Sequence, residues 1–165
     1  MKQKDEKTNV MRLLDQKKVP YTAHFYEDTD GPSGDREYGL HVAQAMGQDP
    51  ERVFKTLVAQ GASGGIYVYE VPVADSLDLR KAAKAVGEKS VQLLPVASIL
   101  AVTGYIRGGC SPVGMKKRFP TVFHETAADF EAVYISAGKI GAQVEVSVRD
   151  LLALLGADTA DIVAE

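Results

Sequence analysis

Residues 103–117 read T-G-Y-I-R-G-G-C-S-P-V-G-M-K-K and hold the residue types best suited to chemistry in this chain. Gly108 and Gly109 carry no Cβ, so the backbone there can adopt positive φ and lie close against another molecule. Pro112 then restricts the path by which the chain leaves the glycine pair. Such a segment can direct several backbone N–H groups at one point and bind a carbonyl oxygen or a phosphate. The plainer interpretation is a tight turn followed by a Ser-Pro step.

Lys55 lies in the apolar pattern V-F-K-T-L-V-A, which predicts a β-strand. Strand alternation places Lys55 on one face and Thr56 on the other, and both faces are largely apolar, so we expect a central strand. Lysine is rarely buried without a partner. Lys55 is therefore either an edge-strand lysine that prevents aggregation or an ammonium that holds an anion or a polarised carbonyl in a pocket. Thr56 adds its hydroxyl there if the strand twists or ends.

The segment Y-I-S-A-G-K-I-G, residues 134–141, predicts a strand that runs into a glycine turn. Ser136 lies at the strand end and Lys139 in the turn, and such places commonly contact ligands. The alternative is a plain connection between two strands. Ser136 has no nearby histidine and no G-x-S-x-G context, so the sequence does not indicate a hydrolase nucleophile here.

Cys110 is the only cysteine, so no internal disulfide can form. A reactive thiolate needs a basic neighbour or a helix N-terminus. Arg107 is close in sequence, but no His or Asn constellation can be assigned to Cys110. The three histidines are far apart, and no Cys/His cluster has zinc spacing, so we expect neither a metal nor a cofactor.

Size and charge narrow the class of protein. A chain of 165 residues, 45% hydrophobic and 25% charged, predicts one soluble domain over residues 1–165. The charged N-terminus lacks a signal-peptide pattern, and no apolar run reaches the ~20 residues of a membrane span, so we expect a cytoplasmic protein. A net charge of −3 argues against a stand-alone binder of long nucleic acid. A short nucleic-acid end can still bind a local basic patch, such as the one at 116–118.

The elements expected to position these residues do not alternate strictly between strand and helix. This favours an α+β fold with a mixed sheet or barrel over a doubly wound one. Val53–Gln60 and Ile66–Val73, joined by G-A-S-G-G, predict a hairpin, and a turn-rich stretch is expected at 28–39. Further strands are expected at 21–26, 90–94, 121–124, 132–136 and 143–146, and helices after Thr8 and at 40–46, 78–86, 97–103 and 148–155.

Four motifs occur along the chain in an order typical of one protein family. V-F-K-T-L-V begins at residue 53, L-R-K-A-A-K-A-V-G at 79, the glycine stretch at 103, and I-S-A-G-K-I-G at 135. In this order and at similar spacings they resemble the YbaK/EbsC proteins, single-domain relatives of the editing domain inserted in bacterial prolyl-tRNA synthetases. The resemblance extends to the closing A-D-I-V segment and implies a mixed, mostly antiparallel, barrel-like β-sheet surrounded by helices.

The resemblance also implies which residues form the site. The family lysine and the threonine after it match Lys55 and Thr56, and the G-x-x-x-P loop that binds the aminoacyl group matches 108–112. Tyr21 is the alternative to Tyr26 as the tyrosine of the first strand. The implied catalytic residues are Lys55, Gly108, Gly109 and Ser111; the implied substrate-binding residues are Tyr26, Phe54, Thr56, Cys110, Pro112, Ser136, Gly138 and Lys139.

The implied activity is that of a trans-editing ester hydrolase that removes cysteine from mischarged tRNA(Pro). The cysteine's own thiol attacks its carbonyl, so no enzyme nucleophile is required, and formation of a thiolactone would give the step a lyase-like character. The implied partner is the tRNA acceptor end, with prolyl-tRNA synthetase as an additional one and no membrane. The alternatives are a deacylase for another small amino acid, such as Ala-tRNA(Pro), and a non-catalytic module that binds tRNA ends or a synthetase.

Overall fold

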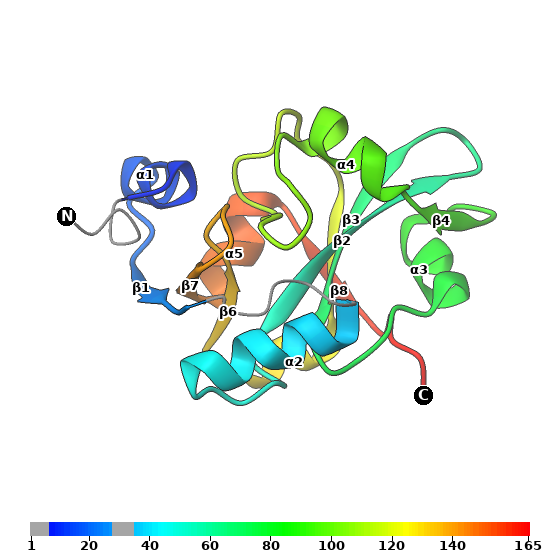
Figure 1. Ribbon diagram of the computed structural model, residues 1–165. Coiled ribbons are helices and arrows are strands. Elements are labelled where there is room, and N and C mark those ends of the chain that lie inside the picture. The colour runs from blue at the N-terminus through cyan, green and yellow to red at the C-terminus, as the bar shows by residue number, and fades with distance from the viewer. Residues whose placement is uncertain (1–6, 28–34) are drawn as a thin grey trace.

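The computed structural model describes residues 7–27 and 35–165, and in this part of the chain two β-sheets form the framework (Figure 1). The three-stranded sheet has the order β1 (Tyr21–Phe25), β7 (Ala142–Ser147), β6 (Ala132–Ser136), and both of its junctions are antiparallel. The five-stranded sheet has the order β4 (Val91–Leu93), β2 (Phe54–Gly61), β3 (Ile66–Pro72), β5 (Thr121–His124), β8 (Asp158–Ala160). Its β3–β5 and β5–β8 junctions are parallel, and the others are antiparallel.

A single parallel bridge between Val53 and Tyr134 connects the two sheets. The N–H of Tyr134 donates to the carbonyl of Arg52 at 2.9 Å, and the N–H of Val73 donates to the carbonyl of Val53 at 2.8 Å. The expected α+β class with a mixed, mostly antiparallel sheet is confirmed. The strands of the described residues do not close into a barrel, because the sheets meet at this bridge alone rather than along a full ladder.

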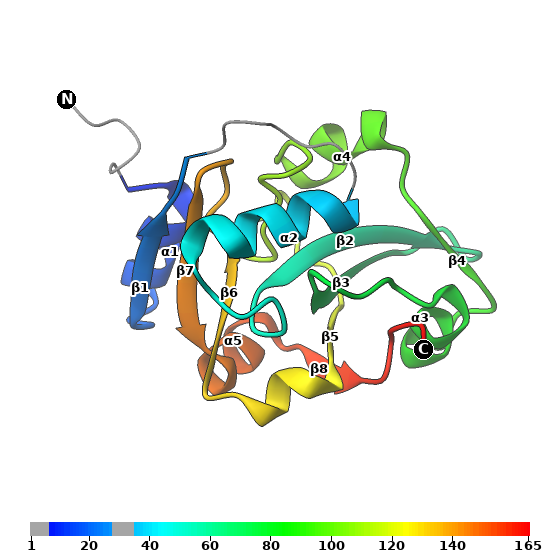
Figure 2. The same ribbon diagram turned by 60° about the horizontal axis from the view of Figure 1, so that its bottom comes forward.

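The helices pack on the sheets from several sides (Figure 2). They are α1 (Asn9–Gln16), α2 (Asp35–Met46), α3 (Leu79–Val86), α4 (Val96–Thr103) and α5 (Val148–Leu155), with a 3-10 helix, η2, over Glu125–Asp129. The Thr8 hydroxyl caps α1 by accepting from the N–H of Met11 at 3.2 Å. Gly87 ends α3 in the left-handed conformation, with φ 74°. The caps expected from sequence are therefore present, since they depend only on local residue types.

Two expectations about elements need correction. Residues 35–39 begin α2, so the turn-rich assignment is wrong there, and residues 28–34 lie outside the described part. The expectation of a turn rested on Gly-Pro-Ser-Gly. The charged residues that follow it have adequate helix propensity, and they form the start of the helix. Strand β8 was not expected at all. It has three residues, two of them polar, and it forms by pairing with β5. No local sequence pattern predicts such a pairing.

The main core lies between the three-stranded sheet and helices α1 and α5. Val10, Ile135 and Leu151 are fully buried there, and Phe54 and Phe123 from the other sheet join them with ring centroids 6.1 Å apart. Helix α3 covers one face of the five-stranded sheet by packing Ala82 and Ala83 on Tyr69. Helix α2 packs Ala43 on Val53 and Tyr134. This last contact places α2 over the junction of the two sheets.

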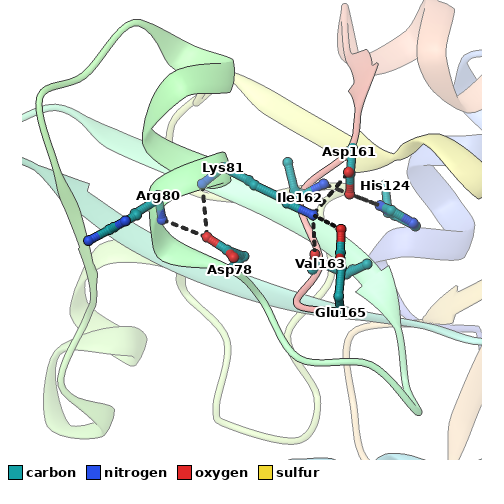
Figure 3. Close-up of polar contacts among 8 residues, drawn as sticks. All are labelled: Asp78, Arg80, Lys81, His124, Asp161, Ile162, Val163 and Glu165. Atoms are coloured by element: carbon teal, nitrogen blue, oxygen red, sulfur yellow. Dashed lines mark hydrogen bonds and ion pairs between the residues drawn. The ribbon is translucent and has the colours of Figure 1, made fainter.

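Polar contacts hold the C-terminal segment to α3 and β5, and Figure 3 shows Lys81 extending from α3 toward Asp161. The Lys81 ammonium lies 3.0 Å from the Asp161 carboxylate and donates to the Val163 carbonyl at 2.9 Å. The N–H of Ile162 donates to Nδ1 of the buried His124 at 3.3 Å. These contacts give Lys81 and His124 a structural role.

Candidate functional site

A cavity opens along the edge of β2, and both Lys55 and Thr56 line it. Strand alternation points these two side chains to opposite faces of the sheet. Both border the cavity because they lie between the bridge to Tyr134 and the hydrogen bond from Leu94 to Val58 that begins the β4 pairing. The expectation of a central strand therefore holds for the end of β2, whereas Lys55 and Thr56 lie at a strand edge. Phe54 also lines the cavity while packing against Phe123.

The glycine-rich loop forms a second wall, where Arg107, Gly108 and Cys110 line the cavity. Internal hydrogen bonds fix its shape. The Tyr105 hydroxyl donates to the Val113 carbonyl, which closes the loop, and the N–H of Gly109 donates to the carbonyl of Ile106 at 3.0 Å. A loop held in this way presents its remaining N–H groups in a constant geometry, as a pocket for an oxygen requires.

The two glycines of the loop serve different purposes. Gly108 has φ 88°, a left-handed conformation that residues with a Cβ adopt only at a cost. Gly109 needs space instead: a Cβ there would lie 3.0 Å from Cα of Lys139 and 3.2 Å from the Ile140 nitrogen. The loop and the 137–141 turn therefore pack backbone against backbone.

Ser136 and Gln143 form the third wall and lie directly opposite each other on β6 and β7. The Ser136 hydroxyl accepts from the N–H of Gly138 at 3.1 Å. Gln143 is 6% exposed, and its amide oxygen has no hydrogen-bond partner in the described structure. An unpartnered buried acceptor beside a cavity is available to a ligand donor. Sequence reasoning missed Gln143; its signal was a polar residue facing Ser136 across the predicted 132–146 strand pair.

The fourth wall is aliphatic and comes from β4, α4 and the residues between them. Leu93, Leu94, Val96 and Ile99 contribute it. Sequence reasoning missed this wall as well, since α4 reads as an ordinary short apolar helix.

Several residues expected at the site lie beside the cavity rather than on its surface. Ser111 is fully buried, and its hydroxyl accepts from the N–H of Val113 at 3.2 Å. Tyr26 is buried against Val42, which does line the cavity, whereas Tyr21 packs in the main core. Pro112 borders a second hollow near α5. The cavity lining also excludes Gly109, Gly138 and Lys139. The N–H of Gly138 and the backbone of Lys139 instead position Ser136 and the glycine loop.

The electrostatics of the cavity keep Cys110 protonated. Burial raises the pKa of its thiol to about 12, and the nearby Glu70 carboxyl acts in the same direction. Glu70 is itself fully buried on β3, directly opposite Thr56, and burial raises its pKa well above the ordinary value. A neutral thiol is a poor nucleophile. No histidine is among the described residues that line the cavity.

The described residues contain no cluster of three or more His, Cys, Asp or Glu side chains that could hold a metal ion. None of the helices in this part of the chain is long and apolar enough to cross a membrane.

Comparison with known proteins decides the family. The sequence model of the aminoacyl-tRNA editing domain matches residues 40–154, which include β2, the glycine loop and the β6–β7 pair. The chain belongs to the aminoacyl-tRNA editing domain family. The function of that family, aminoacyl-tRNA editing, agrees with the resemblance seen in the V-F-K-T and glycine-loop motifs.

Relatives of this editing domain agree in sequence and in fold. The EbsC protein of Enterococcus faecalis, named as a proposed Cys-tRNA(Pro)/Cys-tRNA(Cys) deacylase, is 42% identical over 161 residues, which cover 98% of this chain and 96% of that protein. A crystal structure described as a candidate trans-editing enzyme for prolyl-tRNA synthetase superposes with a TM-score of 0.74 at 28% identity, covering 88% of this chain and 87% of the other. A hypothetical protein at 23% identity, covering 95% of this chain and 100% of its own, shares the fold with a TM-score of 0.83.

Proposed function

We propose that this editing domain, acting as one unit over residues 1–165, hydrolyses the ester that joins cysteine to the 3′ end of tRNA(Pro). The observation that carries the proposal is the convergence on one cavity of Lys55, Thr56, Gly108, Cys110 and Ser136. They come from β2, from the glycine loop and from the end of β6. An ammonium, the Ser136 hydroxyl and a tightly held glycine backbone suit an acyl ester attached to a phosphorylated nucleoside.

In this proposal Lys55 holds a phosphate or the ribose of the terminal adenosine, and the glycine loop binds the carbonyl oxygen. The N–H groups of Gly109 and Val113 are used inside the loop. The N–H groups of Gly108 and Cys110 are therefore the candidates for stabilising the negative charge that develops on that oxygen. Loss of one such donor typically costs ~10²–10³ in rate. The Gln143 amide oxygen is a candidate acceptor for the substrate's ammonium.

The thiol of the bound cysteine is the nucleophile in this mechanism. Its sulfur bonds to the carbonyl carbon, the bond from that carbon to the ribose O3′ breaks, and the thiol proton ends on O3′. The products are free tRNA and a cysteine thiolactone, which water then opens. The raised pKa of Cys110 supports this route, because a protonated enzyme thiol does not compete as nucleophile.

The name of the 42% identical EbsC protein supports cysteine as the amino acid removed. A deacylase for alanine would need water or an enzyme group as nucleophile, since the alanine side chain cannot attack its own carbonyl. A non-catalytic module would bind the acceptor end without turnover. A cytoplasmic location and a synthetase partner remain predictions.

A deacylation panel tests the proposal: the purified protein is incubated with tRNA(Pro) charged with cysteine, alanine, serine or proline. We expect Cys-tRNA(Pro) to be hydrolysed much faster than Pro-tRNA(Pro), and Ser-tRNA(Pro) slowly, because a hydroxyl is a weaker nucleophile than a thiol. Fast release of alanine with no preference for cysteine would refute the substrate-assisted mechanism. Release of cysteine and proline at the same rate as in buffer alone would favour the alternative, a non-catalytic module that binds tRNA ends or a synthetase.

A further inference from the structure

Large aliphatic side chains are exposed on one stretch of the chain beside the cavity. Leu93 is 43% exposed, Val96 57%, Leu100 55% and Ile106 54%. Val96 and Leu100 are four residues apart on α4 and therefore share one face of that helix. Single exposed hydrophobic residues need no explanation, but a group of them marks a binding surface. We refer to Leu93, Val96 and Leu100 as the α4 platform.

The α4 platform is continuous with the mouth of the cavity. Of the described residues that line the cavity, only Leu93, Val96 and Arg107 are exposed; the others are buried or half-buried. All three come from residues 93–107, which contain α4 and the start of the glycine loop. Figure 1 shows this loop leaving the end of α4. A group attached to an acyl chain inside the cavity therefore has these exposed residues beside its way out. The rim thus offers two aliphatic surfaces and one guanidinium to whatever the acyl group is bound to.

We propose that the α4 platform binds the base of the 3′-terminal nucleoside of the substrate tRNA, with Arg107 beside its phosphate. This inference rests on the proposed function, because it places the acyl group in the cavity. The acyl group is bonded to the terminal ribose, so the base on that ribose lies within one nucleoside's length of the cavity mouth. An apolar face satisfies the flat, poorly solvated surface of a base, and guanidinium groups pair with phosphate.

The composition of the rim favours this occupant over a second copy of the chain. A surface that binds itself needs a large apolar area, whereas the α4 platform has few residues and is bordered by a cation. Arg107 complements a polyanion such as tRNA. Binding of the base also acts equally on substrate and transition state, so the platform should govern KM rather than kcat.

The test uses Leu100→Ser, because Leu100 belongs to the platform without lining the cavity. The matched control is Leu79→Ser, which removes another exposed leucine, 43% exposed on α3, outside the cavity lining. Substitutions at such exposed positions change stability little. We expect the trinucleotide CCA to shift the methyl NMR signals of Val96 and Leu100 in the wild-type protein. Leu100→Ser should weaken CCA binding about fivefold and raise KM for Cys-tRNA(Pro) about fivefold with kcat unchanged.

The outcomes separate this inference from the proposed function. Unmoved α4 methyl signals, or equal CCA affinity of the Leu100→Ser and Leu79→Ser proteins, would overturn the platform. A wild-type dimer in sedimentation that Leu100→Ser dissociates would also overturn it, since the face would then join two copies of the chain. CCA binding on α4 by a protein that hydrolyses none of the charged tRNAs would support the platform while refuting the deacylase.

Discussion

Gly109→Ala tests the backbone contact between the glycine loop and the 137–141 turn. The added methyl would lie 3.0 Å from Cα of Lys139, whereas carbon atoms prefer separations of about 3.5–4.0 Å. The two segments must separate by about 0.5 Å or more, because neither neighbour is a flexible side-chain end. Overpacking of this kind costs about 1–3 kcal/mol. At about 2–4 °C per kcal/mol for a chain of this size, Tm should fall by roughly 2–12 °C.

The same displacement should reduce activity, because Gly108 and Cys110 move with Gly109. Misplacement by about 1 Å can cost about 10²-fold in rate, so we expect kcat for Cys-tRNA(Pro) to fall roughly tenfold or more. The matched control is Gly65→Ala, whose methyl would lie 2.9 Å from the hydroxyl end of the Tyr67 side chain, which can move. That variant should keep its kcat and lose about 1 kcal/mol or less. Calorimetry and single-turnover deacylation measure both quantities. Wild-type Tm and kcat in Gly109→Ala would refute the close-packing argument.

Further variants address the cavity itself. Lys55→Ala should reduce kcat/KM at least about 100-fold with an unchanged circular dichroism spectrum, since the ammonium borders the cavity; full activity in a folded variant would make Lys55 structural. Cys110→Ala should retain at least about a tenth of the activity, a loss of no more than ~1.4 kcal/mol, and a collapse with unchanged tRNA binding would indicate an enzyme nucleophile. Glu70→Gln should be more stable than wild type to urea at pH 7. The pKa of Glu70 is raised in the folded state, whereas in the unfolded state the carboxyl ionises freely above its ordinary pKa of 4.5. Ionisation therefore stabilises the unfolded wild-type chain, and glutamine removes this effect. This difference should shrink as the pH falls toward 4 and disappear below it, and a difference independent of pH would contradict the assignment of Glu70 as a neutral acid.

Much of the fold was predictable wherever the signal is local. The β2–β3 hairpin combines alternating aromatic and β-branched residues with a glycine-rich connection, and α3 has a cap at each end. Strand β8 forms only through its parallel pairing with β5, so its three residues carry no pattern of their own. The family resemblance implied a barrel-like mixed sheet. The structure has two sheets joined at Val53 and Tyr134, a contact that depends on tertiary packing and that no local pattern could predict.

The candidate site shows the same division. Lys55, Gly108 and Ser136 were predictable because each breaks the pattern around it: a charge in an apolar strand, a glycine pair in a loop, a serine at a strand end. Gln143 and the aliphatic α4 wall were not, because their place on the cavity follows from which strands and helices meet there. Ser111 was expected at the site from its position in the loop, yet its hydroxyl accepts from the loop backbone instead.

The open edge of β2 has a further consequence for solubility. Between the bridge to Tyr134 and the start of the β4 pairing, residues 55–57 have β3 on one side and no paired strand on the other among the described strands. An unpaired strand edge is a template for intermolecular pairing, and proteins usually cover such edges or place charge on them. Here residues of the glycine loop and of α4 line the same cavity as this edge, and Lys55 supplies a charge within it. The segments that form walls of the cavity thus also hinder another molecule from adding a strand at this edge.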